Sequence, residues 1–234
     1  MTSYTIKNKS GQEIGKKGSE TRKRLLDATF VLLDQKRLKE IRSAEISTIA
    51  QAAPSTFYLY FQSVEDAVLE LIKELDQSNQ HVTEPLHEEW NTDNCYNNAF
   101  RFISRFITYW DENYSALRVR NLAADEKEAA FAKARLASLN PTIQRIEEII
   151  TLSQKAGRVP TELHPRSMAA VIVASLERLA TAYREESKYR PEKLLSKYRT
   201  LLIQSAAFMM ISMMMGERTI PDRRSGAAET NAAP

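Results

Sequence analysis

The sequence is poor in the residues that crosslink chains or interrupt helices. Its 234 residues include a single cysteine, Cys95, only six glycines and three histidines. One cysteine excludes an internal disulfide framework and favours a reducing compartment. Few glycines, with Ala, Leu, Glu, Lys and Arg recurring throughout, favour helices over a turn-rich β fold. We therefore expect an all-α protein.

Long apolar runs are also missing. The most apolar stretch, residues 201–215, is interrupted by Gln204, Ser205 and Ser212, so it is too short for a membrane span and fits a buried core helix. Residues 1–17 are polar and basic and lack the apolar stretch of a signal peptide. These absences predict a cytoplasmic protein that has no membrane partner.

Signals for catalysis or metal binding are equally scarce. His81, His87, His164 and Cys95 lack the spacing of metal ligands. The sequence contains neither a phosphate-cradling glycine loop nor a nucleophile elbow. It therefore predicts no catalytic residues, no metal and no cofactor, and argues against an enzyme. A helical enzyme whose basic front is incidental is the alternative from another class.

Positive charge is concentrated at the front of the chain. Residues 1–62 hold eleven lysines and arginines against six acids, which makes +5; because the whole chain carries +3, the remainder carries −2. A basic front on a near-neutral body is expected of a protein whose first segment meets a polyanion. A solvated basic arm without a partner would have the same charge, so charge alone leaves both interpretations open.

Apolar periodicity divides the chain into about nine helices. Ser63 is placed to cap the fourth, with Asp66 completing an approximate capping box. Asn140 and Pro141 predict a kink or split in the seventh. The expected helices cover about residues 19–36, 43–50, 54–61, 63–79, 93–111, 114–123, 126–156, 165–186 and 191–215.

The second and third of these helices are separated only by Gln51-Ala52-Ala53, which is a tight turn. Three short helices with such a turn predict a helix-turn-helix, whose third helix lies in the major groove of DNA. In residues 54–61, Phe57 and Phe61 can face the core. The other faces carry the hydroxyls of Ser55, Thr56, Tyr58 and Tyr60, which are suited to phosphates, base edges or thymine methyl groups. An ordinary amphipathic helix with two tyrosines is the alternative.

Here the sequence resembles a known family. The run ISTIAQAAPSTFYLYF (46–61), followed by SVEDAV (63–68), resembles the N-terminal signature of tetracycline-repressor-like (TetR-family) regulators, and TRKRLLDA (21–28) resembles the start of their first helix. Gln51 stands where the family usually has glycine, so a left-handed turn there is strained or remodelled. Val64 replaces a usual lysine, and the usual glycine between the first two helices is absent.

The resemblance implies a three-helix helix-turn-helix DNA-binding domain followed by a larger helical ligand-binding and dimerisation domain. We accordingly assign a flexible basic arm to 1–18, the helix-turn-helix domain to 19–66, the ligand-binding and dimerisation domain to 67–216 and a disordered tail to 217–234. The resemblance also implies which residues contact DNA, and Lys16 of the arm could add a further contact. The expected DNA-binding residues are Lys17, Arg22, Arg42, Ser43, Pro54, Ser55, Thr56, Tyr58 and Tyr60.

The last two helices are apolar over more than one face, which predicts a four-helix bundle between two copies, as in TetR-like proteins. Packing within one chain is the alternative. The expected interface residues are Met168, Val171, Ile172, Ser175, Leu176, Leu179, Tyr198, Leu201, Leu202, Ser205, Phe208 and Met209.

Aromatic residues concentrate in and just after the fifth expected helix, where they can line an apolar cavity or form solid core. The resemblance implies that a cavity exists. The expected ligand-binding residues are Tyr96, Phe100, Ile103, Phe106, Tyr109, Trp110, Tyr114 and Arg118.

Together these features predict a ligand-responsive transcriptional regulator. We expect a repressor that binds a palindromic double-stranded DNA operator as a homodimer and is released by a small apolar or amphipathic effector. The alternative is a DNA-binding regulator or activator without a small-molecule pocket.

Overall fold

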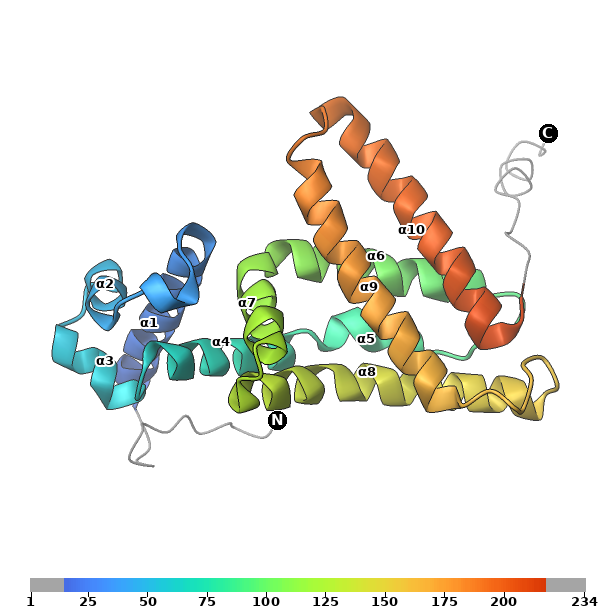
Figure 1. The fold of residues 1–234 in the computed structure, drawn as a ribbon, viewed down its shortest axis with the longest axis horizontal. Helices are drawn as coiled ribbons and strands as arrows, with labels where there is room; N and C mark the ends of the chain where they lie inside the picture. Colours follow the sequence, from blue (N-terminus) through green and yellow to red (C-terminus); the bar gives the residue numbers. More distant parts are fainter. Residues whose placement is uncertain (1–14, 218–234) are drawn as a thin grey trace, which may run out of the picture. The chain divides into compact units, whose positions relative to one another are not determined.

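The structure is a computed structural model that describes residues 15–217. Within that range it contains ten α-helices and one 3-10 helix and has no strand (Figure 1). None of these helices is both long enough and apolar enough to span a bilayer. The predicted flexible arm and disordered tail fall mostly on residues 1–14 and 218–234, which lie outside the described part of the chain.

The described residues form two compact units, one from residues 15–79 and 112–138 and the other from residues 80–111 and 139–217. In the first unit, α4 and α7 pack against α1, so this unit contains more than a helix-turn-helix. Its described elements are α1 (Lys16–Gln35), η1 (Leu38–Glu40), α2 (Ser43–Ile49), α3 (Pro54–Tyr60), α4 (Val64–Ser78), α7 (Tyr114–Asp125) and the start of α8 (Ala129–Lys155).

The second unit contains the remaining helices, and within it α9 packs against α10. Its elements are α5 (Gln80–His87), α6 (Cys95–Glu112), the rest of α8, α9 (Pro165–Ser187) and α10 (Glu192–Met215). The helix α5 was not expected, because it falls in the polar, proline-containing stretch between the helices predicted at 63–79 and 93–111. Pro85 is buried in this short helix, and its carbonyl accepts a hydrogen bond from the Trp90 indole at 3.1 Å.

The nine expected helices are all present, with end points close to those predicted. The first begins at Lys16, with Gly15 rather than Ser19 as its N-cap. The split expected at Pro141 does not occur, since α8 is one helix from Ala129 to Lys155. Both Pro141 and Ala137 are exposed, so water can reach the carbonyl that a proline ring leaves without its helical donor.

A continuous apolar core holds the first unit together. The completely buried residues of this core include Leu25 of α1, Ile46 of α2, Phe57 of α3, Phe61 directly after α3, and Val68 of α4. The four helical ones come from the apolar sides of their helices, where residues three or four apart share a face. Four elements therefore meet in one core, and this fixes the orientation of α3.

The turn between α2 and α3 has the backbone of a Schellman motif. The Ala52 amide donates to the Ser47 carbonyl at 2.9 Å, and the Gln51 amide donates to the Thr48 carbonyl at 3.1 Å. Gln51 lies between them with φ of 52°, the left-handed conformation that glycine adopts most easily. The family's usual turn is thus retained without its glycine, at a conformational cost.

We predict that Gln51→Gly stabilises the protein by about 0.5–1 kcal/mol, because glycine relieves the left-handed strain while its added chain entropy removes part of the gain. Chemical denaturation monitored by circular dichroism measures the change. The control is Ala44→Gly, at an exposed position inside α2, which should lose about 0.5–1 kcal/mol. Equal losses in both variants would contradict the prediction.

Candidate nucleic-acid interface

The helix α3 is short and presents two different sides. It begins at Pro54, where the missing amide donor costs nothing, and it extends for seven residues. Phe57 is completely buried, as is Phe61 directly after the helix, whereas 50% of Tyr58 is exposed. Burial of the two phenylalanines therefore turns the tyrosine toward solvent, as the sequence predicts.

The expected contact residues of α3 differ in how far they reach solvent. Pro54 and Ser55 are exposed, while Thr56 is half-buried. Tyr60 is also half-buried and packs against the core of the first unit. Ser55 and Tyr58 are therefore the most accessible of the predicted hydroxyls on this helix.

A hydrogen bond joins α3 to the start of α2. The hydroxyls of Ser43 and Tyr58 lie 2.8 Å apart, and either can donate. The Tyr58 ring also packs edge-on against Phe57, with centroids 5.4 Å apart. These contacts hold the exposed phenol in one place, which is useful for a group that contacts a phosphate or a base edge.

Charged groups surround the start of α2. Arg42 is exposed and precedes the helix, and its backbone amide donates to the Glu45 carboxylate at 3.1 Å. The Lys36 ammonium also hydrogen-bonds to this carboxylate. That bond and the one from the Arg42 amide hold the pKa of Glu45 below its usual value. Lys36 is thus paired, while the exposed Arg42 guanidinium can reach a phosphate.

On α1 the structure separates the predicted phosphate contacts. Lys16 and Lys17 are exposed in its first turn. Arg22, by contrast, is buried, and its guanidinium pairs with the carboxylates of Glu70, at 2.6 Å, and Glu74 on α4. It also lies over the Phe61 ring, 5.6 Å from the centroid. The expected phosphate contact by Arg22 therefore does not match its position, because the pairing with α4 occupies its guanidinium.

The structure adds exposed side chains that the sequence argument did not select. Leu59 on α3 is 61% exposed and next to Tyr58, so it can contact a thymine methyl group. Lys23 and Arg24 are exposed on α1, beside the buried Arg22. Leu25 and Leu26, which directly follow these residues, are buried. The sequence alone could not tell the exposed Lys23 and Arg24 from the buried Arg22, because that difference depends on how α4 packs.

In the second unit, α6 carries six of the eight predicted ligand-binding residues. Phe100 is half-buried and the other five are buried. The rings of Phe106 and Trp110 lie 6.4 Å apart, and Phe102 lies 5.9 Å from Phe106. The six are Tyr96, Phe100, Ile103, Phe106, Tyr109 and Trp110.

The remaining two, Tyr114 and Arg118, lie on α7 in the first unit, and both are half-buried. Metal ligands give no further lead, because residues 15–217 contain no group of three or more His, Cys, Asp or Glu that could hold an ion.

The predicted dimer residues fall into two groups. Ile172 and Leu176 are buried inside the second unit. Val171, Leu201 and Met209 are 55%, 51% and 59% exposed, which leaves apolar surface on α9 and α10. Exposed residues of the same set are Ser175 and Ser205, and half-buried ones are Met168, Leu179, Tyr198, Leu202 and Phe208.

The third helix is exposed, carries hydroxyls and follows a tight turn, and the described part of the chain has only helices. These features define a helix-turn-helix protein with a larger helical body.

Comparison with known proteins agrees with this class. Residues 82–190 match the model of the tetracyclin repressor-like C-terminal domain. The chain is also 26% identical, over 189 residues, to YdgC of Bacillus subtilis (strain 168), an uncharacterized HTH-type transcriptional regulator, covering 80% of this chain and 93% of YdgC.

Solved structures have the same fold. The transcriptional regulator FadR of Bacillus subtilis, in complex with stearoyl-CoA, has a TM-score of 0.65 at 17% identity, with 82% of this chain and 98% of that chain covered. FadR of Thermus thermophilus, a TetR-family repressor in complex with lauroyl-CoA, has a TM-score of 0.53 at 15% identity, with 86% and 98% covered. Residues 82–190 thus belong to the tetracyclin repressor-like C-terminal domain family, and the chain is similar to TetR-family transcriptional regulators, which confirms the resemblance.

We predict that Tyr58→Phe weakens binding to DNA from the chain's own upstream region about tenfold, because the phenol loses a hydrogen bond to the duplex. Fluorescence anisotropy with labelled DNA measures the affinity. Stability should change by less than about 0.5 kcal/mol, since the Ser43 bond is exposed. The matched control is Tyr189→Phe at an 88% exposed position of the second unit, which should bind like wild type. An unchanged affinity in Tyr58→Phe would remove this phenol from the interface.

Proposed function

We propose that this protein is a repressor that binds a palindromic operator as a homodimer and is released by an amphipathic acyl effector. The observation that carries the DNA-binding part is the hydroxyl-bearing side of α3, held outward by the buried Phe57 and Phe61. The exposed Lys17 and Arg42 provide charge to contact phosphates. Tyr58, Ser55 and Leu59 provide groups that can reach base edges.

A second copy of the chain is the partner that the operator geometry requires. One module of this size reads only a short site, and two on a twofold axis read half-sites about 34–36 Å apart. The exposed side of α9 forms a mostly apolar groove of about 520 Å³ along Val171, Ala174, Ser175 and Leu179, with Arg178 also in its lining. Leu201 and Met209 expose further apolar surface on α10. Burying these side chains in a bundle of α9 and α10 from two copies favours association.

The aromatic residues of α6 and the structurally similar FadR regulators support the proposed effector class. The FadR proteins of Bacillus subtilis and Thermus thermophilus have the fold of this chain and are complexed with stearoyl-CoA and lauroyl-CoA. Phe106, Tyr109 and Trp110 of this chain supply apolar side chains that can contact an acyl group. Binding would release the operator to the extent that the acyl effector prefers the form that does not bind DNA.

A second candidate is a regulator without a small-molecule pocket. The ring contacts of Phe106 with Phe102 and Trp110 favour it, because such contacts also occur in a solid core. The two candidates differ in their response to acyl-CoA.

We predict that stearoyl-CoA and lauroyl-CoA release the protein from its upstream DNA in a mobility-shift assay, whereas free CoA does not. Phe106→Leu should still bind DNA and should require about tenfold more acyl-CoA, since it keeps the buried position apolar but removes the ring. Failure of every acyl-CoA to release wild-type protein, with DNA binding intact, would favour the second candidate.

We also predict that Val171→Glu converts the dimer to a monomer, because two carboxylates would be buried near the twofold axis. Sedimentation velocity measures the oligomer, and operator affinity should fall with it. Leu152→Glu on α8 is the control, since Leu152 is 58% exposed in the same unit and is not among the expected interface residues. Dimers of equal stability in both variants would contradict an interface through α9.

A further inference from the structure

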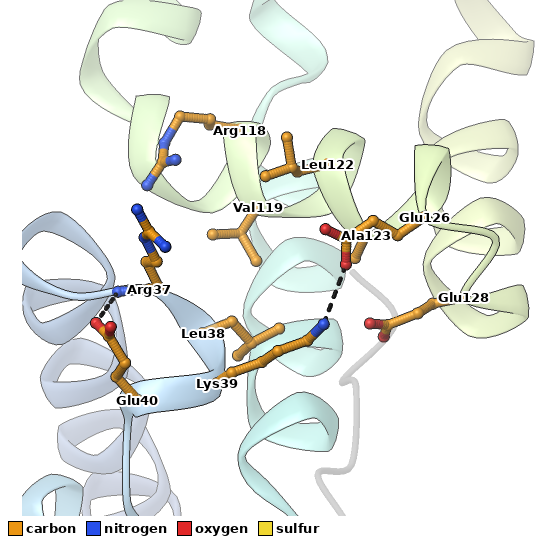
Figure 2. Close-up of a pocket in the computed structure, with 10 residues that line it drawn as sticks. All are labelled: Arg37, Leu38, Lys39, Glu40, Arg118, Val119, Leu122, Ala123, Glu126 and Glu128. Atoms are coloured by element: carbon orange, nitrogen blue, oxygen red, sulfur yellow. Dashed lines mark hydrogen bonds and ion pairs between the residues drawn. The ribbon is translucent and has the colours of Figure 1, made fainter.

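The first unit contains a cleft that the proposed function does not use. It has a volume of about 510 Å³. Arg37 and the residues of η1 form one wall, and residues of α7 together with Glu126 and Glu128 form the other (Figure 2). That volume is within the range of small-molecule sites. Because η1 connects α1 to α2, one wall of the cleft is part of the helix-turn-helix chain segment.

Two arginines meet at one end of the cleft. Figure 2 shows the guanidinium groups of Arg37 and Arg118 pointing toward each other from opposite walls. Within residues 15–217 neither guanidinium forms an ion pair with a carboxylate. Glu40 is close by, but its carboxylate accepts from the backbone amide of Arg37, at 3.2 Å. Two facing cations repel, and an anion between them would replace this repulsion with forked, charge-assisted hydrogen bonds.

The other end of the cleft limits the charge of an occupant. There the Lys39 ammonium pairs with the Glu126 carboxylate at 3.3 Å, and the Glu128 carboxylate points toward the same lysine (Figure 2). With two acids and one lysine, this end is net negative and would repel a second anionic group. A nucleotide or another polyanion therefore fits poorly, whereas a ligand with one negative charge fits.

The middle of the cleft is apolar. Leu38 comes from η1, and Val119 and Leu122 come from α7. Leu122 is 53% exposed although it belongs to this wall, so apolar surface is available to be covered. A ligand that gains from these contacts has a hydrocarbon part next to its anionic group.

We propose that this cleft binds a small organic monoanion whose carboxylate lies between Arg37 and Arg118. Its apolar part covers Leu38, Val119 and Leu122. The site is distinct from the acyl site proposed for α6, which belongs to the other unit. An occupant joins the connection between α1 and α2 to α7, so it stabilises the unit that carries α3 by mass action.

Octanoate is the probe, and calorimetric titration of the full-length protein without DNA is the measurement. We expect octanoate to bind, and Arg118→Gln to weaken binding about tenfold or more, because one guanidinium is lost from the carboxylate. Arg118→Lys should fall between the two, since an ammonium keeps the charge without the planar fork. Lys133→Gln removes a charge from an exposed position on α8 in the same unit and should not change the affinity.

Two further variants and two control ligands test whether octanoate binds in this cleft and whether any loss of binding is specific. Arg37→Gln changes an exposed residue and should weaken octanoate as Arg118→Gln does. Phe106→Leu should leave this binding event intact, since the cleft lies in the other unit. Octan-1-ol and inorganic phosphate, which each lack one half of the proposed ligand, should both bind more weakly.

Three results would overturn the proposal: no binding of octanoate at millimolar concentration, equal binding by wild type and both arginine variants, or octan-1-ol or phosphate binding as tightly as octanoate. These results are independent of the repressor proposal, which fails instead if the protein does not bind its upstream DNA.

Discussion

The burial of Phe57 and Phe61 is the contact on which the proposed DNA-facing surface depends. A helix of seven residues is not stable in isolation, so α3 exists because these rings pack with Leu25, Ile46 and Val68. Their spacing of four places both on one side of the chain. Everything that α3 offers to a duplex is therefore on the sides that this core leaves uncovered.

Ion pairs decide which positive charges remain available around that core. Arg22 is neutralised by two acids of α4, and Lys36 by Glu45. Both pairs join elements of the first unit, so part of its positive charge is used to hold helices together. The basic surface available to a polyanion is therefore smaller than the charge count of the first residues indicates. Lys17 and Arg42, which we propose as phosphate contacts, remain exposed.

Much of the fold could be predicted because it depends on neighbours three or four residues apart. The nine expected helices, the cap at Ser63 and the tight turn at Gln51 follow from local spacing and composition. The helix around Pro85 was missed because its stability comes from burial, which polar neighbours conceal. The paired Arg22 and the facing Arg37 and Arg118 could not be predicted, because their surroundings come from segments distant in the chain.

The sequence by itself determined an all-helical fold, the approximate bounds of nine of its helices, and the apolar and hydroxyl-bearing sides of the third one. Periodicity and end-capping act within one or two helical turns, so they can be read from the order of residues. Only the tertiary structure decided that Arg22 lies against α4, that Leu59 and Val171 remain exposed, and that a cleft forms beside α7. Exposure and pairing depend on which helices meet, and packing determines that.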